Sequence, residues 1–272
     1  MSFLERLHAA ARANDSWLCV GLDPDPSMLP TGLSLDMFLD GVVEATQDLV
    51  CCFKPNLAFF EALGMEGQQA VRSLLRRIPS SIPVLIDAKR GDTPHSMSAY
   101  ARAIFEDLHA DAVTVSPYLG ADSLAPFLQY ADRGVFLLCK TSNPGAGEIQ
   151  DLMVGAEPLY LHIARRALAW DRHGTVGLVV GATYPGDVAA VRQIAPDTPI
   201  LLPGVGAQAG DLEAAVRSAA DSNGERVIVN ASRSVLYASR AADWQNTAHQ
   251  AADALRHQIN GARANPSATR AR

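Results

Sequence analysis

The chain has 272 residues, 48% of them apolar and 19% charged, which is a typical globular composition. Its 23 Lys and Arg and 29 Asp and Glu residues give a net charge of −6, which disfavours a nucleic-acid binder because such a protein needs a basic face. No apolar run is long enough for a membrane span, and the N-terminal residues lack the pattern of a secretory signal. We therefore expect a cytoplasmic protein with four reduced, buried cysteines and, at most, a small anionic ligand.

From the N-terminus onward, an amphipathic stretch at 1–17 is followed by short apolar runs that alternate with helical patterns. The apolar runs are nearly continuous, which is typical of strands covered on both faces. They predict strands at 17–22, 50–54, 84–89, 112–116, 135–140, 177–182, 200–204 and 227–231. The patterns between them predict helices at 34–49, 67–78, 96–110, 156–173, 186–195 and 209–221.

Eight strands alternating with helices favour an α/β fold, a (β/α)₈ TIM barrel in a single domain. We expect the barrel to occupy residues 1–259, with the N-terminal helix plugging its bottom or packing beside it. Residues 260–272 are small, polar and basic, and we expect them to form a disordered tail. The alternative fold is a doubly wound open sheet, although no glycine-rich nucleotide fingerprint follows the first strand.

In such barrels the active site lies at the C-terminal ends of the strands, and charged residues gather there. Asp87 and Lys89 are two residues apart near the end of the third strand, so they share one face. Lys54 ends the second strand and Asp23 ends the first. Alternating Lys and Asp side chains remain ionised because each charge stabilises its neighbours. The alternative interpretation is a purely structural ion-pair network.

A phosphate site is predicted after the last two strands. The sequence PGVGAQ at 203–208 contains Pro203 and Gln208, and its glycines allow the backbone to approach a ligand closely. Ser232 and Arg233 follow the eighth strand, and the loops after strands seven and eight are the usual phosphate site of this fold. The substrate is then a phosphate monoester, whereas the alternative is a plain turn beside a surface arginine. No histidine or cysteine spacing predicts a metal.

These motifs resemble the orotidine 5′-phosphate decarboxylase family, in its longer bacterial subgroup. The resemblance spans nearly the whole predicted barrel, at GLD 21–23, FKPN 53–56, DAKRGD 87–92, TSNPG 141–145, PGVGAQ 203–208 and Arg233. It implies conversion of orotidine 5′-monophosphate (OMP) to UMP and carbon dioxide in pyrimidine biosynthesis, with no cofactor and no metal.

The resemblance also implies a role for each matching residue. Lys89 protonates C6 of the pyrimidine as carbon dioxide leaves, and Asp87 lies against the substrate carboxylate. Lys54 and Asp23 contact the ribose. Ser142 hydrogen-bonds the pyrimidine amide edge.

Further roles concern the phosphate and a second subunit. Gln208, Arg233 and the backbone at Ser232 bind the phosphate, beside Pro203. Asp92 and Ser96 reach the neighbouring active site of a homodimer.

Three alternatives remain on the same fold. A metal-dependent sugar-phosphate decarboxylase or aldolase would hold Mg²⁺ on the carboxylates, but the cation at Lys54 competes with a metal. A Schiff-base aldolase would use Lys89 as nucleophile, but the flanking Asp87 and Asp92 favour its protonated form. The third alternative is a phosphate-ligand binding protein without turnover.

Overall fold

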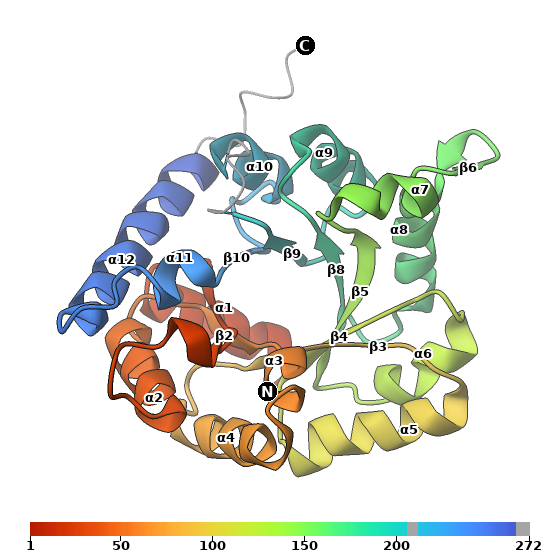
Figure 1. Cartoon of the computed structure of the whole chain (residues 1–272). Helices are drawn as coiled ribbons and strands as arrows, with labels where there is room; N and C mark the ends of the chain where they lie inside the picture. The colour runs from red at the N-terminus through yellow and green to blue at the C-terminus, as the bar shows by residue number, and fades with distance from the viewer. Residues whose placement is uncertain (206–211, 265–272) are drawn as a thin grey trace.

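The computed structural model describes residues 1–205 and 212–264 of the chain. Its main sheet has the strand order β2-β1-β10-β9-β8-β5-β4-β3, with every neighbouring pair parallel. The two outermost strands meet through isolated parallel bridges, Phe53 with Val84 and Asn56 with Asp87. The sheet thus closes on itself (Figure 1), so the predicted barrel is confirmed and the open doubly wound sheet is wrong.

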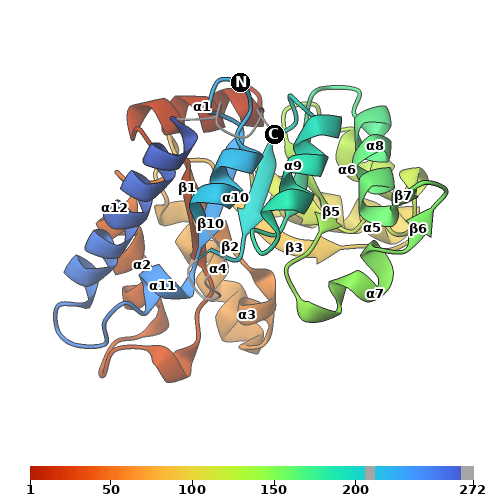
Figure 2. The ribbon, with the colours of Figure 1, turned by 90° about the horizontal axis from the view of Figure 1, so that it is seen from above.

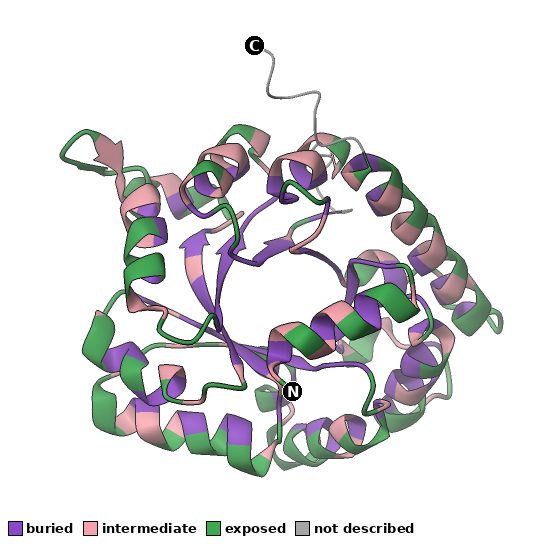
Figure 3. Ribbon diagram, turned by 180° about the vertical axis from the view of Figure 1, so that it is seen from behind, coloured by how far each residue is buried: buried purple, intermediate pink, exposed green. Residues whose placement is uncertain are grey.

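All eight predicted strands are present, with ends within two residues of expectation. They are β1 (Leu18–Leu22), β2 (Cys52–Pro55), β3 (Leu85–Arg90), β4 (Ala112–Val115), β5 (Gly134–Lys140), β8 (Val176–Val180), β9 (Ile200–Pro203) and β10 (Val227–Ala231). Every residue of β1, β8 and β10 is buried. This explains why the strands are continuous apolar runs, since helices cover one face and the barrel core covers the other (Figure 3).

Helices surround the barrel. They are α1 (Phe3–Ala13), α2 (Leu35–Thr46), α3 (Leu57–Glu61), α4 (Gly64–Arg77), α5 (Pro94–Arg102), α6 (Ala121–Leu128), α7 (Gly147–Gln150), α8 (Leu159–Trp170), α9 (Pro185–Ile194), α10 (Leu212–Ala219), α11 (Arg233–Leu236) and α12 (Trp244–Arg263). A π-helical turn, η2 (Ala103–Asp107), continues α5, and a hairpin of β6 (Met153–Val154) and β7 (Glu157–Pro158) precedes α8.

Helix α1 closes the N-terminal end of the barrel. A capping box between Ser2 and Glu5 starts it, and the ring of Phe3 packs edge-on against Phe136 of β5 with centroids 5.8 Å apart. Figure 2 shows α1 at one end of the barrel and α3, α7 and α11 at the other. The open mouth therefore lies where the strands end.

The predicted boundary of the C-terminal tail needs correction. Helix α12 continues to Arg263, four residues into the range 260–272 that was expected to be tail. Ala262 is buried, and the Arg263 guanidinium pairs with Asp15 at 3.2 Å and donates to the Gly224 carbonyl. These contacts stabilise the last turn. Residues 265–272 lie outside the described residues, so their part of the prediction is untested.

Two simpler expectations concern the membrane and the cysteines. Within 1–205 and 212–264, no helix combines the length and apolarity needed to cross a bilayer. The four cysteines are buried free thiols, as expected.

Candidate active site

Asp87 is the centre of a row of charges at the mouth of the barrel. The Lys54 Nζ lies 2.9 Å from Asp87 Oδ2, and the Lys89 Nζ lies 2.6 Å from Asp87 Oδ1. The side chains of Lys54 and Asp87 are only 3% and 10% exposed, whereas that of Lys89 is 49% exposed. The buried pair thus anchors a lysine that remains open to a ligand.

The charges in this row stabilise one another. Burial opposes the charged form of Lys54, but the negative charges of Asp87 and Asp23 outweigh it and hold the pKa of Lys54 above its usual value. Burial also opposes the charged form of Asp87, but Lys54 and Lys89 outweigh it and hold the pKa of Asp87 well below its usual value. The row is therefore an ionised, preorganised array.

A bulge in β3 brings Lys89 to Asp87. Lys89 has a φ of +45°, in the left-handed region that residues with a Cβ disfavour, and the register with β4 shifts between Ile86 and Arg90. The Lys89 amide donates to Thr114 Oγ1 at 3.0 Å, and the Thr114 hydroxyl donates to Asp87 Oδ1 at 2.8 Å. Thr114 was not among the predicted site residues, and its only signal in the sequence is a polar residue within the apolar run at 112–116.

Asp23 lies at the edge of this row. Its Oδ1 is buried and has no hydrogen-bond partner among the described residues. The loop that carries it is held by Tyr237, whose hydroxyl donates to the Asp23 carbonyl at 3.2 Å and accepts from the Asp25 amide at 2.6 Å. A buried carboxylate oxygen without a partner is costly, so a ligand hydroxyl would find an acceptor here.

Asp92 and Ser96 do not join the row within one chain. The Asp92 carboxylate accepts from the Thr93 amide at 2.7 Å, and no ion pair links it to Lys89 of the same chain in the part that the structure describes. The Ser123 hydroxyl donates to the Asp92 carbonyl and fixes the loop. Ser96 lies on α5 and is partly exposed.

A cavity of about 370 Å³ opens beside the charge row. Its walls include Asp23, Gly204, Asn230, Ser232 and Arg233. A Cβ atom on Gly21 would lie 2.0 Å from Ser232 Oγ, so glycine is required there for β1 to approach the start of α11. Arg233 is exposed, and its guanidinium has no ion-pair or hydrogen-bond partner in 1–205 and 212–264. A cavity of this size accommodates a small ligand, and Arg233 offers it a cation that no described residue pairs with.

Ser142 lies next to Gly204, one of the residues that line this cavity. A Cβ atom on Gly204, which has a φ of +94°, would lie 3.6 Å from Ser142 Oγ. Pro203 precedes this glycine, and its carbonyl accepts from the Ala182 amide at 3.0 Å. Gln208, the remaining predicted phosphate ligand, lies outside the described residues.

The connection from β5 to α8 supports the Ser142 loop. Gln150 accepts from the Thr141 amide and donates to the Thr141 hydroxyl, both at 2.8 Å. The buried Lys140 is not part of the charge row and pairs with Asp151. Helix α7 and the β6–β7 hairpin in this connection were not predicted from the sequence.

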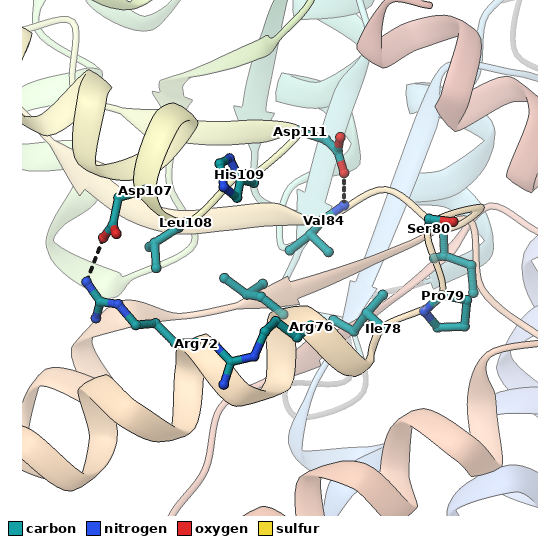
Figure 4. A pocket seen from close by; sticks show the side chains of 12 residues that line it. Arg72, Arg76, Ile78, Pro79, Ser80, Val84, Asp107, Leu108, His109 and Asp111 are labelled. Carbon is teal, nitrogen blue, oxygen red and sulfur yellow. Dashed lines mark hydrogen bonds and ion pairs between the residues drawn. The ribbon is translucent and has the colours of Figure 1, made fainter.

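A second cavity lies near the N-terminal ends of β3 and β4, away from the charge row. It measures about 550 Å³ and lies between α4 and η2, lined by Arg72, Ile78 and His109 among others (Figure 4). Arg72 is already paired with Asp107 at 2.6 Å, and none of the predicted site residues lines it. The mouth of the barrel is therefore the better candidate site. No group of three or more His, Cys, Asp or Glu residues within the described ranges is arranged to hold a metal ion.

Comparisons with known proteins agree with this geometry. The sequence model of the orotidine 5′-phosphate decarboxylase / HUMPS family matches residues 16–249. The chain belongs to this family. It is 53% identical over 269 residues to orotidine 5′-phosphate decarboxylase of Roseiflexus castenholzii, covering 96% of this chain and 98% of the relative.

Solved structures agree as well. The Leishmania donovani OMP decarboxylase matches with a TM-score of 0.85 and 41% identity, covering 97% of this chain and 99% of the other. The Leishmania donovani UMP synthase matches with a TM-score of 0.88 and 43% identity, but this chain spans only 57% of that longer one. The predicted family membership is thus confirmed.

For this member of the orotidine 5′-phosphate decarboxylase family, we expect Asp87→Asn to lower the free energy of unfolding by about 3 kcal/mol, because it leaves Lys54 buried without its closest counter-charge. Urea denaturation at neutral pH measures this change. Asp132→Asn is the control, since Asp132 is 56% exposed and pairs only loosely with Arg133. A loss for Asp87→Asn no larger than the control's would show that the Lys54–Asp87 pair contributes little to stability.

Proposed function

We propose that the chain decarboxylates OMP to UMP and carbon dioxide in pyrimidine biosynthesis. The observation that carries the proposal is the Lys54–Asp87–Lys89 row, which stands ionised at the mouth of a barrel whose sequence matches the decarboxylase family. Two relatives that align with this chain over nearly their full length are named orotidine 5′-phosphate decarboxylase.

We propose separate contacts for the three parts of the substrate, which are the phosphate, the ribose and the pyrimidine. The phosphate would contact Arg233 and the backbone at Ser232, beside Pro203, and Gln208, which lies outside the described residues, is proposed as a further phosphate ligand. The ribose hydroxyls would meet Asp23 and Lys54, and an acceptor role for Asp23 is supported by its Oδ1, which has no hydrogen-bond partner within residues 1–205 and 212–264. The pyrimidine amide edge faces Ser142, and the C6 carboxylate faces Asp87 and Lys89.

The reaction then follows from the charges of the row. The bond between C6 and the carboxylate carbon breaks, carbon dioxide leaves, and the electron pair stays in an sp² orbital on C6 that no π system delocalises. The Lys89 ammonium stabilises this charge because Asp87 holds it in place beforehand, so little reorganisation is needed. A proton passes from Lys89 Nζ to C6, and Lys89 regains a proton from solvent. Asp87 also repels the substrate carboxylate, and this repulsion ends as carbon dioxide departs.

Our proposal includes a homodimer in the cytoplasm. Asp92 does not pair with Lys89 in its own chain, which supports a role for Asp92 in the neighbouring active site. Ser96 follows it at the start of α5 and would contact the ribose across the same interface. Each active site then contains residues from two chains.

The direct test is the loss of OMP absorbance when purified protein is added in the presence of EDTA. Full activity supports the proposed cofactor-free reaction. Activity that requires Mg²⁺ would favour the metal-dependent alternative, and a borohydride-trapped adduct on Lys89 would favour the Schiff-base aldolase. Tight OMP binding without turnover would favour the binding protein.

We expect Arg233→Ala to raise KM for OMP by about 10- to 100-fold, because a charge-assisted contact to the phosphate is lost. Steady-state kinetics measure KM, and the unphosphorylated nucleoside orotidine offers a second readout. With orotidine, Arg233→Ala and the native protein should have equal kcat/KM. Arg165→Ala is the control, since Arg165 is exposed on α8 and pairs with Glu157. An unchanged KM for OMP would show that the phosphate binds elsewhere.

A further inference from the structure

The hydroxyl of Thr114 links two members of the charge row. Thr114 is 1% exposed in the middle of β4, next to β3 in the barrel. Its Oγ1 accepts the Lys89 amide at 3.0 Å and donates to Asp87 Oδ1 at 2.8 Å. One buried oxygen thus contacts the backbone of one charged residue and the side chain of the other.

The direction of these two hydrogen bonds follows from the groups involved. A backbone amide is only a donor, so Oγ1 must accept from Lys89. An ionised carboxylate is only an acceptor, so the Thr114 proton must point at Asp87. Asp87 Oδ1 then receives hydrogen bonds from both Thr114 and the Lys89 ammonium. The hydroxyl has a single favourable orientation, and it fixes the position of the carboxylate.

The second consequence concerns the backbone of Lys89. Its φ of +45° is unfavourable for a lysine, and the bulge interrupts the hydrogen-bond ladder between β3 and β4. The amide of Lys89 therefore depends on a side chain for its partner, and Thr114 on the facing strand provides it. Loss of this bond would allow the backbone to relax and would carry the lysine side chain away from Asp87.

We infer that Thr114 is a positioning residue for the decarboxylation, because its hydroxyl holds the strained Lys89 backbone and the Asp87 carboxylate in one fixed arrangement. It acts through these two residues. The inference rests on the proposed function, in which Lys89 and Asp87 act on C6. Independently of that function, we expect the Lys89 amide to be hydrogen-bonded in the protein without a ligand.

The test compares Thr114→Val, which keeps the shape and removes the hydroxyl, with Thr114→Ser, which keeps the hydroxyl. We expect Thr114→Val to lower kcat by about 10- to 100-fold with less than about a threefold change in KM, because the ground-state contacts to phosphate and ribose remain. Thr114→Ser should keep kcat within about threefold of the native value.

Thr46→Val is the matched control. Thr46 is also fully buried, and its hydroxyl donates to the Val42 carbonyl of its own helix, with no contact to Asp87 or Lys89 among the described residues. It reports what removal of a buried hydroxyl does to thermal stability, and its kcat should be unchanged. Equal losses of kcat in Thr114→Val and Thr114→Ser, or no loss in Thr114→Val, would overturn the inference.

Amide hydrogen exchange in the native protein keeps the inference testable if Thr114→Val fails to fold. The Lys89 amide should exchange much more slowly than an unprotected amide, and rapid exchange would overturn the inference. This readout is independent of turnover. Absent decarboxylation by the native protein together with a protected Lys89 amide would refute the proposed function and leave the Thr114–Lys89 contact intact.

Discussion

Lys89→Ala should lower kcat for OMP decarboxylation by more than about 1,000-fold, because the substitution removes the proposed proton donor, which is also the cation proposed to stabilise the developing charge. UMP binding should persist, since the phosphate and ribose contacts do not involve Lys89. The Lys89 side chain is half exposed, so its truncation leaves no buried cavity. Single-turnover kinetics and UMP titration by calorimetry measure the two quantities separately.

Lys89→Arg separates the two roles of this lysine. A guanidinium keeps the positive charge but does not give up a proton near neutral pH, so this variant should also be inactive as a proton donor. If Lys89→Ala retained more than about a tenth of the native kcat, the proposed role would be contradicted. General-acid catalysis alone usually contributes a rate factor of about 100 or more.

Mixing Lys89→Ala with Asp92→Ala protein should restore decarboxylase activity that neither variant has alone. If Asp92 acts in the partner's active site, each heterodimer has one site without either substitution. Random exchange makes half the dimers heterodimers, so about a quarter of all sites should become native in an equal mixture. Activity is followed after subunit exchange, which native mass spectrometry verifies.

The double variant Lys89→Ala, Asp92→Ala is the control for this experiment. On its own it forms only sites that lack both residues, and it should remain inactive under the same exchange conditions. Mixing it with either single variant also yields no native site. No recovery in verified heterodimers of the two single variants would show that Asp92 acts within its own chain or does not act at all.

The strands could be predicted because their signal is local. A strand covered on both faces must be apolar throughout, as in β1 and β10, so short continuous runs identify it. The meeting of Lys54, Asp87 and Lys89 could be predicted for a related reason, since parallel strands in a barrel end at one rim.

Two helices were missed for different reasons. Helix α6 was missed because it has only eight residues and contains Pro126. Helix α12 was missed because its buried face is largely alanine, at positions such as Ala248 and Ala252.

The bulge at Lys89 and the role of Thr114 could not be predicted from the sequence. A left-handed φ at a lysine is not favoured by any local preference and arises from contacts between β3 and β4. The alternation rule correctly placed Asp87 and Lys89 together, although the regular strand that it assumes is absent there. Whether Asp92 and Ser96 complete a neighbouring site depends on a second chain, and a single sequence has no local pattern for such a contact.

The contact between β2 and β3, which closes the barrel, also affects the charge row. These strands meet through two isolated bridges, and the ion pair between Lys54 and Asp87 crosses the same seam. Local opening of the barrel at this seam would therefore separate the charges that we propose to act on the substrate. Conversely, a ligand that stabilises the charge row also stabilises the closed barrel. The seam that closes the wall and the proposed reacting end of the site are thus the same place, so we expect a ligand bound at the charge row to stabilise the folded barrel as well.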